Sequence, residues 1–227
     1  MSEPAGAVAL AGLKKYSSKK KKNLLAISSG ANLNFDRLSY IVERSEFGED
    51  REKILSIQIP EKAGSFLKLS KIFSNSQITE FNYRLSDPND AHVLVGIKTK
   101  SSKNFMSLKN RLSKNHYSFK DLTKNEISND HLRHMVGGRS PTAKTERVFR
   151  MEFPERPGAL LDFLEKLGNK WNITLFHYRN LGSAFGKVLV GIEDTSKNKE
   201  LLKRYLKTTG YTFTEETSNI AYKHFLE

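Results

Sequence analysis

The sequence predicts an α+β protein: two tandem ferredoxin-like modules with the element order β-α-β-β-α-β, preceded by a short remnant of an α/β domain. Three observations predict this fold. Sequence blocks repeat in one order about 94 residues apart, each copy switches between strand and helix periodicity, and residues 1–50 contain a single buried-strand pattern. Elements in this order place the helices on one face of an antiparallel sheet.

The repeat is the firmest of these observations. "FNYR" at 81–84 returns as "FHYR" at 176–179, and "LVGI" occurs at both 94–97 and 189–192, so these blocks lie 95 residues apart. Other pairs lie 94 residues apart: Pro60 and Pro154, Glu61 and Glu155, Gly64 and Gly158, and "YSF" at 117–119 with "YTF" at 211–213. The tails "NDHLRHM" and "NIAYKHF" also match. We interpret the pattern as a duplicated module, with copies at 51–138 and 139–227.

The first strand and helix of each copy follow from the spacing of apolar residues. In the first copy, Leu55, Ile57 and Ile59 alternate with polar residues, which predicts a half-buried strand. Pro60 ends this strand, because proline cannot donate to a strand ladder. The helical face that follows consists of Phe66, Leu69, Ile72 and Phe73. The second copy repeats both patterns, with Phe149, Met151 and Phe153 in the strand and Leu160, Leu161, Leu164 and Leu167 in the helix.

The remaining elements of the first copy follow in order. Residues 78–85 are rich in β-branched and aromatic residues, which predicts a strand. "DPND" at 87–90 predicts a turn, and residues 91–98 form the next strand. A second helix is predicted by the spacing of Phe105, Leu108 and Leu112, and residues 117–122 close the unit as a strand. The sheet faces without helices are free to pair with each other or to bind a partner.

Residues 1–50 do not form a domain of their own. "EPAGAVALAGLKKY" (3–16) predicts an alanine-rich helix, and "NLLAIS" (23–28) predicts a buried strand of a parallel sheet. "SGAN" (29–32) is a turn, and residues 35–48 predict a second helix. Because a parallel strand needs neighbours on both sides, this region is expected to be the end of a larger α/β domain.

Two duplicated loops are the candidate binding sites. In "PEKAG" and "PERPG" a strand ends at proline and a glycine opens a helix, whose unpaired N–H groups bind carboxylates or phosphates. Strand alternation places the following tyrosine and arginine on opposite sheet faces, so we expect tyrosine to line a recess and arginine to hold an inter-module or inter-subunit contact. The expected effector-binding residues are Gly64, Phe66, Tyr83, Arg84, Gly158, Leu160, Tyr178 and Arg179. The alternative is purely structural: a turn glycine, a core aromatic residue and a solvated arginine.

Composition excludes some functions and leaves others open. The chain has no cysteine, which excludes disulfides and thiolate metal sites, and it has no signal-peptide pattern or membrane-length apolar run. The net charge is +13, with six lysines between Lys14 and Lys22. We interpret this charge as a solvated surface, and a basic nucleic-acid binder is the weaker alternative. His131 and His134 have the spacing of metal ligands, but the pattern provides no third ligand, so no metal is expected.

The chain as a whole resembles the C-terminal part of biosynthetic threonine dehydratase (threonine ammonia-lyase). The resemblance rests on "EPAGA", "SGANLNF", "ERSEFGEDRE", "IPEKAGSF", "TEFNYR", "MVGGR", "FPERPGALLDFL" and "WNITLFHYR", which run almost end to end in one order. It implies two ACT-like regulatory modules that bind isoleucine and valine as effectors, in a tetrameric cytoplasmic enzyme. It also implies pyridoxal phosphate as the cofactor of the full-length enzyme, with Ser29 as the residue that faces the pyridine nitrogen.

The resemblance is incomplete at the catalytic end. The family's Schiff-base lysine and glycine-rich phosphate loop have no counterpart here, so no cofactor site is complete and no catalytic residue is expected. The chain is therefore expected to need a separate catalytic chain, or to assemble as a homo-oligomer. A free-standing amino-acid-binding module is the alternative. Arg133, just before "MVGGR", is expected to tie one module to the other.

Overall fold

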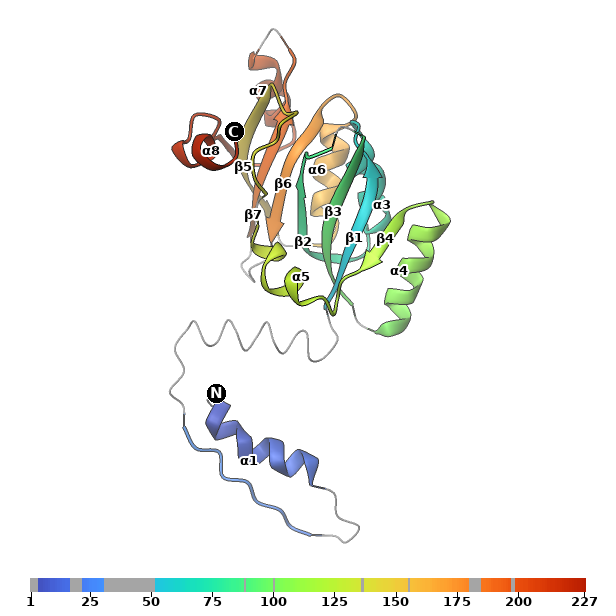
Figure 1. Ribbon diagram of the computed structural model, residues 1–227, viewed down its shortest axis with the longest axis vertical. Coiled ribbons are helices and arrows are strands. Elements are labelled where there is room, and N and C mark those ends of the chain that lie inside the picture. Colours follow the sequence, from blue (N-terminus) through green and yellow to red (C-terminus); the bar gives the residue numbers. More distant parts are fainter. Residues whose placement is uncertain are drawn as a thin grey trace. The chain divides into compact units, whose positions relative to one another are not determined.

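The computed structural model describes residues 4–16, 22–30, 52–87, 89–99, 101–135, 137–154, 156–179, 185–196 and 199–227 (Figure 1). These residues belong to two compact units, 1–49 and 50–227.

The first unit contains the predicted alanine-rich helix, α1 (Pro4–Lys15). The expected buried strand at 23–28 is wrong: residues 22–30 form neither helix nor strand, and Leu25 and Ile27 are 89% and 76% exposed. Among the described residues of this unit no other strand pairs with this segment, so the apolar pattern alone does not form a strand. Residues 17–21 of the lysine run and the helix expected at 35–48 lie outside the described residues.

The second unit has the predicted element order twice. The first module contains β1 (Glu52–Pro60), α3 (Ser65–Ile72), β2 (Gln77–Arg84), β3 (Asp90–Lys98), α4 (Ser102–Lys114) and β4 (Ser118–Asp121), followed by α5 (Glu126–Asp130) and the 3₁₀ turn η1 (Leu132–His134). The second contains β5 (Glu146–Pro154), α6 (Ala159–Leu167), β6 (Asn172–Arg179), β7 (Phe185–Glu193), α7 (Lys199–Thr208), β8 (Phe213–Glu215) and α8 (Ile220–Phe225). The tandem ferredoxin-like fold is therefore confirmed. We call the two copies module 1 and module 2.

The modules join edge to edge rather than face to face. Strands β2 and β6 pair antiparallel, from Glu80 opposite Arg179 to Arg84 opposite Leu175. The result is one eight-stranded sheet in the order β4-β1-β3-β2-β6-β7-β5-β8 (Figure 1). Asn82 faces His177 at the centre of this pairing, so a pseudo-twofold axis passes between them. Pairing the two strands saturates backbone groups that would otherwise remain open at two sheet edges.

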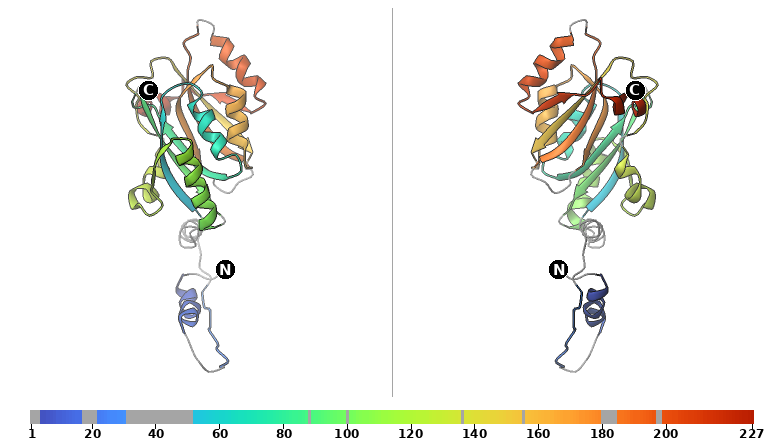
Figure 2. Two further views of the ribbon diagram at one scale, coloured as in Figure 1. Left: turned by 90° about the vertical axis from the view of Figure 1, so that its right-hand side faces the viewer. Right: turned by 90° about the vertical axis from the view of Figure 1, so that its left-hand side faces the viewer.

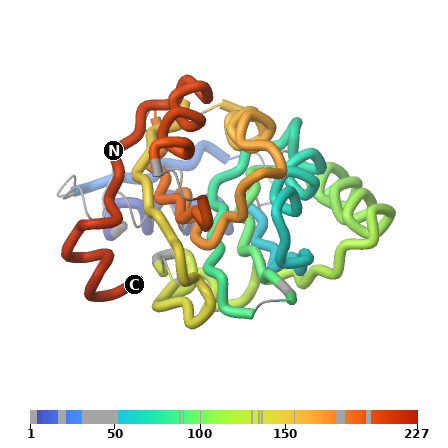
Figure 3. The backbone as a smooth tube through the Cα atoms, turned by 90° about the horizontal axis from the view of Figure 1, so that it is seen from above, coloured from blue at the N-terminus to red at the C-terminus, as the bar shows by residue number. Residues whose placement is uncertain are grey.

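Helices α3, α4, α6 and α7 cover one face of the sheet, as Figure 2 shows from the side. Helix α3 packs against α6 across the seam between the modules, and the same two helices lie next to each other in Figure 3. Beneath them, the rings of Phe81 and Phe176 meet edge to face with centroids 5.5 Å apart. Both rings are fully buried, so the core runs continuously through both modules.

The two tails, α5 and α8, lie against the other face of the sheet. Asn125 caps α5 and Asn219 caps α8, and each accepts a bond from the first turn of its helix. Before each cap, Thr123 Oγ1 and Thr217 Oγ1 accept an N–H from the first strand of their own module, at 3.2 and 3.0 Å. The tails therefore repeat at a spacing of 94 residues, like the rest of the module. The match of "NDHLRHM" with "NIAYKHF" is wrong by four residues, because the capping positions, and not the histidines, are equivalent.

Candidate functional site

Two equivalent recesses lie where the modules meet on the helical face. Each combines the N-terminus of one module's first helix with the loop that follows the first helix of the other module. Gly64 and Gly158 open these helices with φ angles of 87° and 84°, in the left-handed region that favours glycine. The loop residue next to Gly158 is Ser74, and the residue next to Gly64 is Asn169. We call the two sites the Gly158 recess and the Gly64 recess.

The Gly158 recess encloses a cavity of about 30 Å³. Its walls come from both modules and include Phe73, Ser74, Gln77 and Ile78 of module 1 and Phe153, Pro157, Leu160 and Tyr178 of module 2. A cavity of this size has room for about two water molecules. A β-carbon added to Gly158 would find its nearest neighbour, the carbonyl oxygen of Ser74, at 3.9 Å, so the floor of this recess is open.

The chemistry of the Gly158 recess suits a small apolar molecule with one anionic end. Gly158 has no side chain to cap α6, so the first-turn N–H groups of this nine-residue helix provide a partial positive charge. Leu160 and Phe153 provide apolar walls. The Tyr178 hydroxyl donates a long hydrogen bond, 3.4 Å, to the carbonyl of Ile78. Such a recess can hold a carboxylate at the helix and an aliphatic chain against the wall.

The Gly64 recess has the same plan but is filled. A β-carbon added to Gly64 would lie 2.8 Å from Asn169 Cγ and closer still to its Oδ1. Phe66 occupies the position of Leu160, and its ring packs against the edge of Tyr83 with centroids 4.8 Å apart. The side chain of Asn169 and the ring of Phe66 thus occupy space that is open in the other recess.

Glu61 completes the filling of the Gly64 recess. Its carboxylate accepts hydrogen bonds from the Tyr83 hydroxyl and from Asn172 Nδ2, the latter at 3.0 Å. Burial raises the pKa of Glu61, although both hydrogen bonds oppose the rise. Burial, followed by the bond to Glu61, also raises the pKa of the Tyr83 phenol. The polar group with which Tyr83 would contact a ligand is therefore already bonded within the protein.

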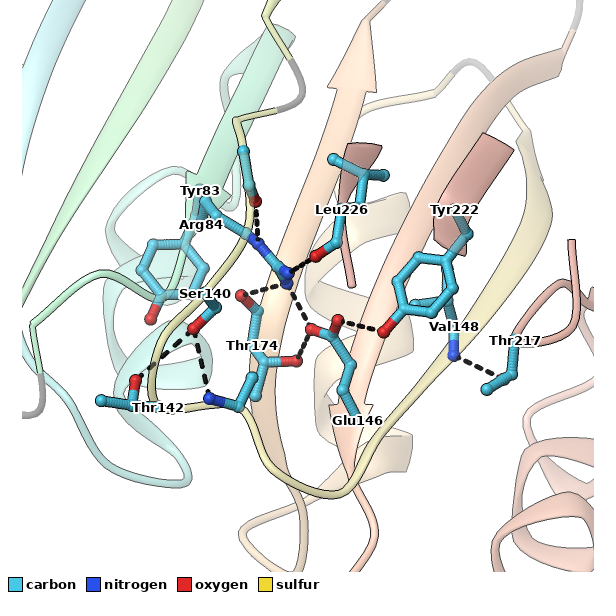
Figure 4. A network of polar contacts seen from close by, with 12 residues as sticks. Tyr83, Arg84, Ser140, Thr142, Glu146, Val148, Thr174, Thr217, Tyr222 and Leu226 are labelled. Atoms are coloured by element: carbon cyan, nitrogen blue, oxygen red, sulfur yellow. Dashed lines mark hydrogen bonds and ion pairs between the residues drawn. The ribbon is translucent and has the colours of Figure 1, made fainter. Parts of the chain in front are cut away.

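Arg84 lies on the opposite face of the sheet from both recesses. Its guanidinium forms an ion pair with Glu146 and donates to the carbonyls of Gly138 (2.8 Å) and Leu226 (2.5 Å), as Figure 4 shows. Glu146, only 2% exposed in its side chain, also accepts hydrogen bonds from Thr174 and from the Tyr222 hydroxyl. Arg84 thus connects module 1 to the linker, to module 2 and to the C-terminal tail.

This geometry bears on two assignments made from the sequence. Arg84 does not line a recess, because strand alternation directs it to the other face, and its inter-module contact is the role it has. Arg133 forms ion pairs with Glu80 (2.5 Å) and Glu52 (2.8 Å) of module 1, whereas the Arg84 guanidinium bonds to Glu146 of module 2. Arg179 stands opposite Glu80 in the β2–β6 register, where its charge acts to lower the pKa of Glu80.

Glu61, Ser74 and Asn169 were missed by the sequence analysis. The signal for Ser74 and Asn169 was available, since the repeat spacing of 95 residues makes them equivalent. What the sequence does not reveal is that each residue faces the glycine of the other module, because this contact depends on the edge-to-edge pairing of β2 with β6.

The described residues of the first unit do not fit a pyridoxal phosphate site. Ser29, the residue expected near the pyridine nitrogen, is exposed and lies in a segment without helix or strand. A cofactor of this kind needs a lysine and a phosphate cradle held by packed elements. Across the part of the chain that the structure describes, no group of three His, Asp or Glu side chains is arranged to hold a metal ion, and no helix is long and apolar enough to span a membrane.

Comparison with known proteins identifies the repeated unit. The family model described as the C-terminal regulatory domain of threonine dehydratase matches twice, at residues 43–132 and 137–226. These two matches cover most of the chain, one over each repeat.

Full-length relatives give the same result. The chain is 43% identical to biosynthetic L-threonine dehydratases from Burkholderia multivorans and Escherichia coli, covering 99% and 100% of this chain and 45% of each relative. It is 41% identical to the chloroplastic enzyme of Arabidopsis thaliana, over 93% of this chain and 36% of that protein. The chain spans less than half the length of these relatives. Aspartate kinase from Synechocystis, a solved structure, matches at 9% identity over 73% of this chain and 43% of that one, with a TM-score of 0.26, too low to carry an argument.

Proposed function

Because the chain belongs to the threonine dehydratase C-terminal regulatory domain family, we propose that it is the isoleucine- and valine-sensing part of a pyridoxal-phosphate-dependent threonine ammonia-lyase in the cytoplasm. The observation that carries this proposal is the open Gly158 recess between the two modules. The ligand's carboxylate would lie at the N-terminus of α6, and its branched side chain would contact Leu160 and Tyr178.

Binding in the Gly158 recess would move the modules relative to each other. The cavity is too small for a branched-chain amino acid, so the loop at Ser74 must move away from α6 to admit one. The recess draws its walls from both modules, and α3 packs directly against α6. A ligand that binds only the widened arrangement shifts the population toward it, which is the physical basis of allosteric control.

In this proposal the chain regulates and does not catalyse. The catalytic half belongs to the rest of a longer protein or to a separate partner chain, and the regulatory part assembles as a homo-oligomer or with that partner. The position of Arg84 supports a coupling route to the rest of an enzyme. Its neighbour Tyr83 lies on the helical face, while Arg84 holds both the linker and the C-terminal tail on the other face.

Calorimetric titration of the chain with isoleucine and with valine tests this function. We expect saturable binding of both amino acids in the micromolar-to-millimolar range, and an affinity lowered about tenfold or more by Tyr178→Ala, which removes one wall of the recess. Tyr117→Ala is the matched control, because this half-buried tyrosine belongs to module 1 and is not part of the recess wall. The absence of binding by either amino acid, or equal affinities in wild type and Tyr178→Ala, would contradict the proposal.

A further inference from the structure

The two recesses differ in ways that a shared backbone does not require. They are related by the pseudo-twofold axis, and their glycines have nearly the same φ angle. The nearest neighbour of a β-carbon added at Gly158 would be 3.9 Å away, whereas at Gly64 the added atom would overlap the side chain of Asn169. The difference therefore comes from side chains and not from the fold.

Among the equivalent positions that differ between the recesses, three carry the side chains that fill the Gly64 recess. Each exchanges one residue of the open recess for another in the filled recess: Leu160 for Phe66, Ser74 for Asn169, and Gln77 for Asn172. Phenylalanine is larger than leucine, and asparagine is larger than serine, so the first two exchanges remove free volume. The third places an amide nitrogen 3.0 Å from Glu61 Oε1, which holds that carboxylate in place.

The held carboxylate of Glu61 also opposes an incoming ligand. It lies three residues before Gly64, next to the helix N-terminus at which an amino acid would place its own carboxylate. Two carboxylates at one helix end repel each other. Glu155 stands at the equivalent position before Gly158, so what distinguishes the Gly64 recess is the bond from Asn172 that holds Glu61 in place. The Tyr83 hydroxyl, bonded to Glu61, has no hydrogen left to donate to a ligand.

We infer that the chain binds one effector molecule rather than two, in the Gly158 recess alone, and that Phe66, Asn169 and Asn172 with Glu61 close the Gly64 recess. The inference rests on the proposed function, because it assumes that the recess type binds an effector. Module 2 then supplies the helix that binds the effector, and module 1 supplies the loop that must move. The Gly64 recess stays closed.

The first measurement is the stoichiometry of isoleucine binding to the whole chain by calorimetry. We expect about one molecule per chain. A value of about two would overturn the inference and leave the proposed function intact. No binding would instead contradict the proposed function, so the two failures are distinguishable.

Exchanging the three side chains tests the assignment of the site. The triple variant Leu160→Phe, Ser74→Asn and Gln77→Asn copies the filled recess onto the open one, and we expect it to lose isoleucine binding. The reciprocal variant Phe66→Leu, Asn169→Ser and Asn172→Gln copies the open recess onto the filled one, and we expect the stoichiometry to rise toward two.

Both variants use only residues that the other module already accommodates, and thermal unfolding shows whether each is folded. Undiminished binding in a folded first variant would overturn the inference. So would an unchanged stoichiometry of one in a folded second variant, since the exchanged residues would then not be what closes the Gly64 recess. If one variant does not fold, the other still decides between these outcomes.

Discussion

The open face of the sheet carries two equivalent buried carboxylates that are neutralised in different ways. In module 1, Glu52 accepts from Thr79 and pairs with Arg133, which also pairs with Glu80. In module 2, Glu146 accepts from Thr174 and Tyr222 and pairs with Arg84. Leu175 replaces Glu80 at the equivalent position. The cation that neutralises Glu52 in module 1 is therefore Arg133 of its own tail, whereas the cation that neutralises Glu146 in module 2 is Arg84 of module 1.

This difference shows how a duplicated module becomes dependent on its neighbour. Glu52 and Glu146 lie 94 residues apart, and Thr79 and Thr174 lie 95 apart, so the acceptor and its first donor are duplicated. The cation is not duplicated, because the position that corresponds to Arg133 at the tail spacing of 94 is Glu227. Module 1 can neutralise its carboxylates alone, but module 2 requires contact across the seam.

The largest effect is expected from Arg133→Ala. The side chains of Glu52 and Glu80 are 8% and 0% exposed, and they would lose the guanidinium that neutralises them. Removing one partner of a buried ion pair costs about 3–5 kcal/mol, and two carboxylates are left here, so we expect about 4 kcal/mol or more by urea unfolding at neutral pH. Burial raises the pKa of Glu80, although Arg133 acts to lower it. Because Glu80 becomes protonated and neutral as the pH falls, the loss of stability caused by Arg133→Ala should become smaller at lower pH.

The chain supplies a matched rescue for Arg133→Ala. Adding Glu80→Leu copies the Leu175 of module 2 and removes the second stranded carboxylate, so the double variant should recover part of the lost stability. A loss below about 1 kcal/mol in the single variant would mean that water reaches the carboxylates, and the proposed difference between the clusters would not hold.

A smaller but more informative effect is expected from Arg84→Ala, at about 3 kcal/mol. Only one carboxylate, Glu146, loses its cation, and the Tyr222 and Thr174 hydroxyls still donate to it. The seam between the modules is weakened at the same time, so module 2 should unfold before module 1. The single tryptophan, Trp171, lies in module 2, which makes this separation measurable.

Tryptophan fluorescence and far-ultraviolet circular dichroism should give coincident unfolding curves for the wild type. For Arg84→Ala the fluorescence transition should come first, whereas for Arg133→Ala it should not. Arg84→Lys, which keeps the charge but loses the forked donors, should lie between Arg84→Ala and wild type. Coincident curves in Arg84→Ala would show that the β2–β6 pairing alone couples the modules.

The fold was predictable because each element is specified by a local sequence pattern, and each pattern occurs in both modules. Strand alternation at Leu55, Ile57 and Ile59 and the paired glycine loops each specify an element, and the repeat confirms every element independently. The edge-to-edge join was not predictable, because β2 and β6 have no distinctive edge pattern. The apolar segment at 23–28 was mispredicted because periodicity cannot show whether a strand has neighbours.

The sequence predicted the type of binding site but not how many of the two recesses are open. The glycine loops and tyrosines identify two recesses, and the structure gives them one plan. Whether a recess is open depends on contacts that the local sequence does not encode, such as Asn169 against Gly64 and Glu61 against Asn172, 111 residues away. The partners of Arg84 are similarly distant: the Leu226 carbonyl lies 142 residues further along the chain.

The smallest expected effect compares the two outer edges of the sheet, where Lys109–Asp121 in module 1 corresponds to Lys203–Glu215 in module 2. Module 2 adds a second cation, because Arg147 Nε lies 2.9 Å from Glu215. Burial alone would raise the pKa of Glu215, but the bonds from Arg147 and Lys203 outweigh it and lower this pKa to about 2. Burial is likewise outweighed at Asp121, whose pKa is lowered chiefly by Lys109.

A folded-state pKa below the unfolded value of 4.5 gives stability that is present above about pH 4.5 and is lost as the pH falls toward 2. Glu215→Gln should therefore cost about 1–2 kcal/mol near pH 7, a figure kept low because the carboxylate is a quarter exposed, and almost nothing near pH 2. Asp121 pairs with one cation, whereas Glu215 pairs with two. Asp121→Asn should therefore reduce the pH dependence of the unfolding free energy, measured in urea over the same pH range, by less than Glu215→Gln does. If both variants reduced the pH dependence of stability equally, Arg147 would contribute little to the pKa shift of Glu215. The ion pair of Arg147 with Asp194, at 2.8 Å, would then be the contact that holds Arg147 at the edge of module 2.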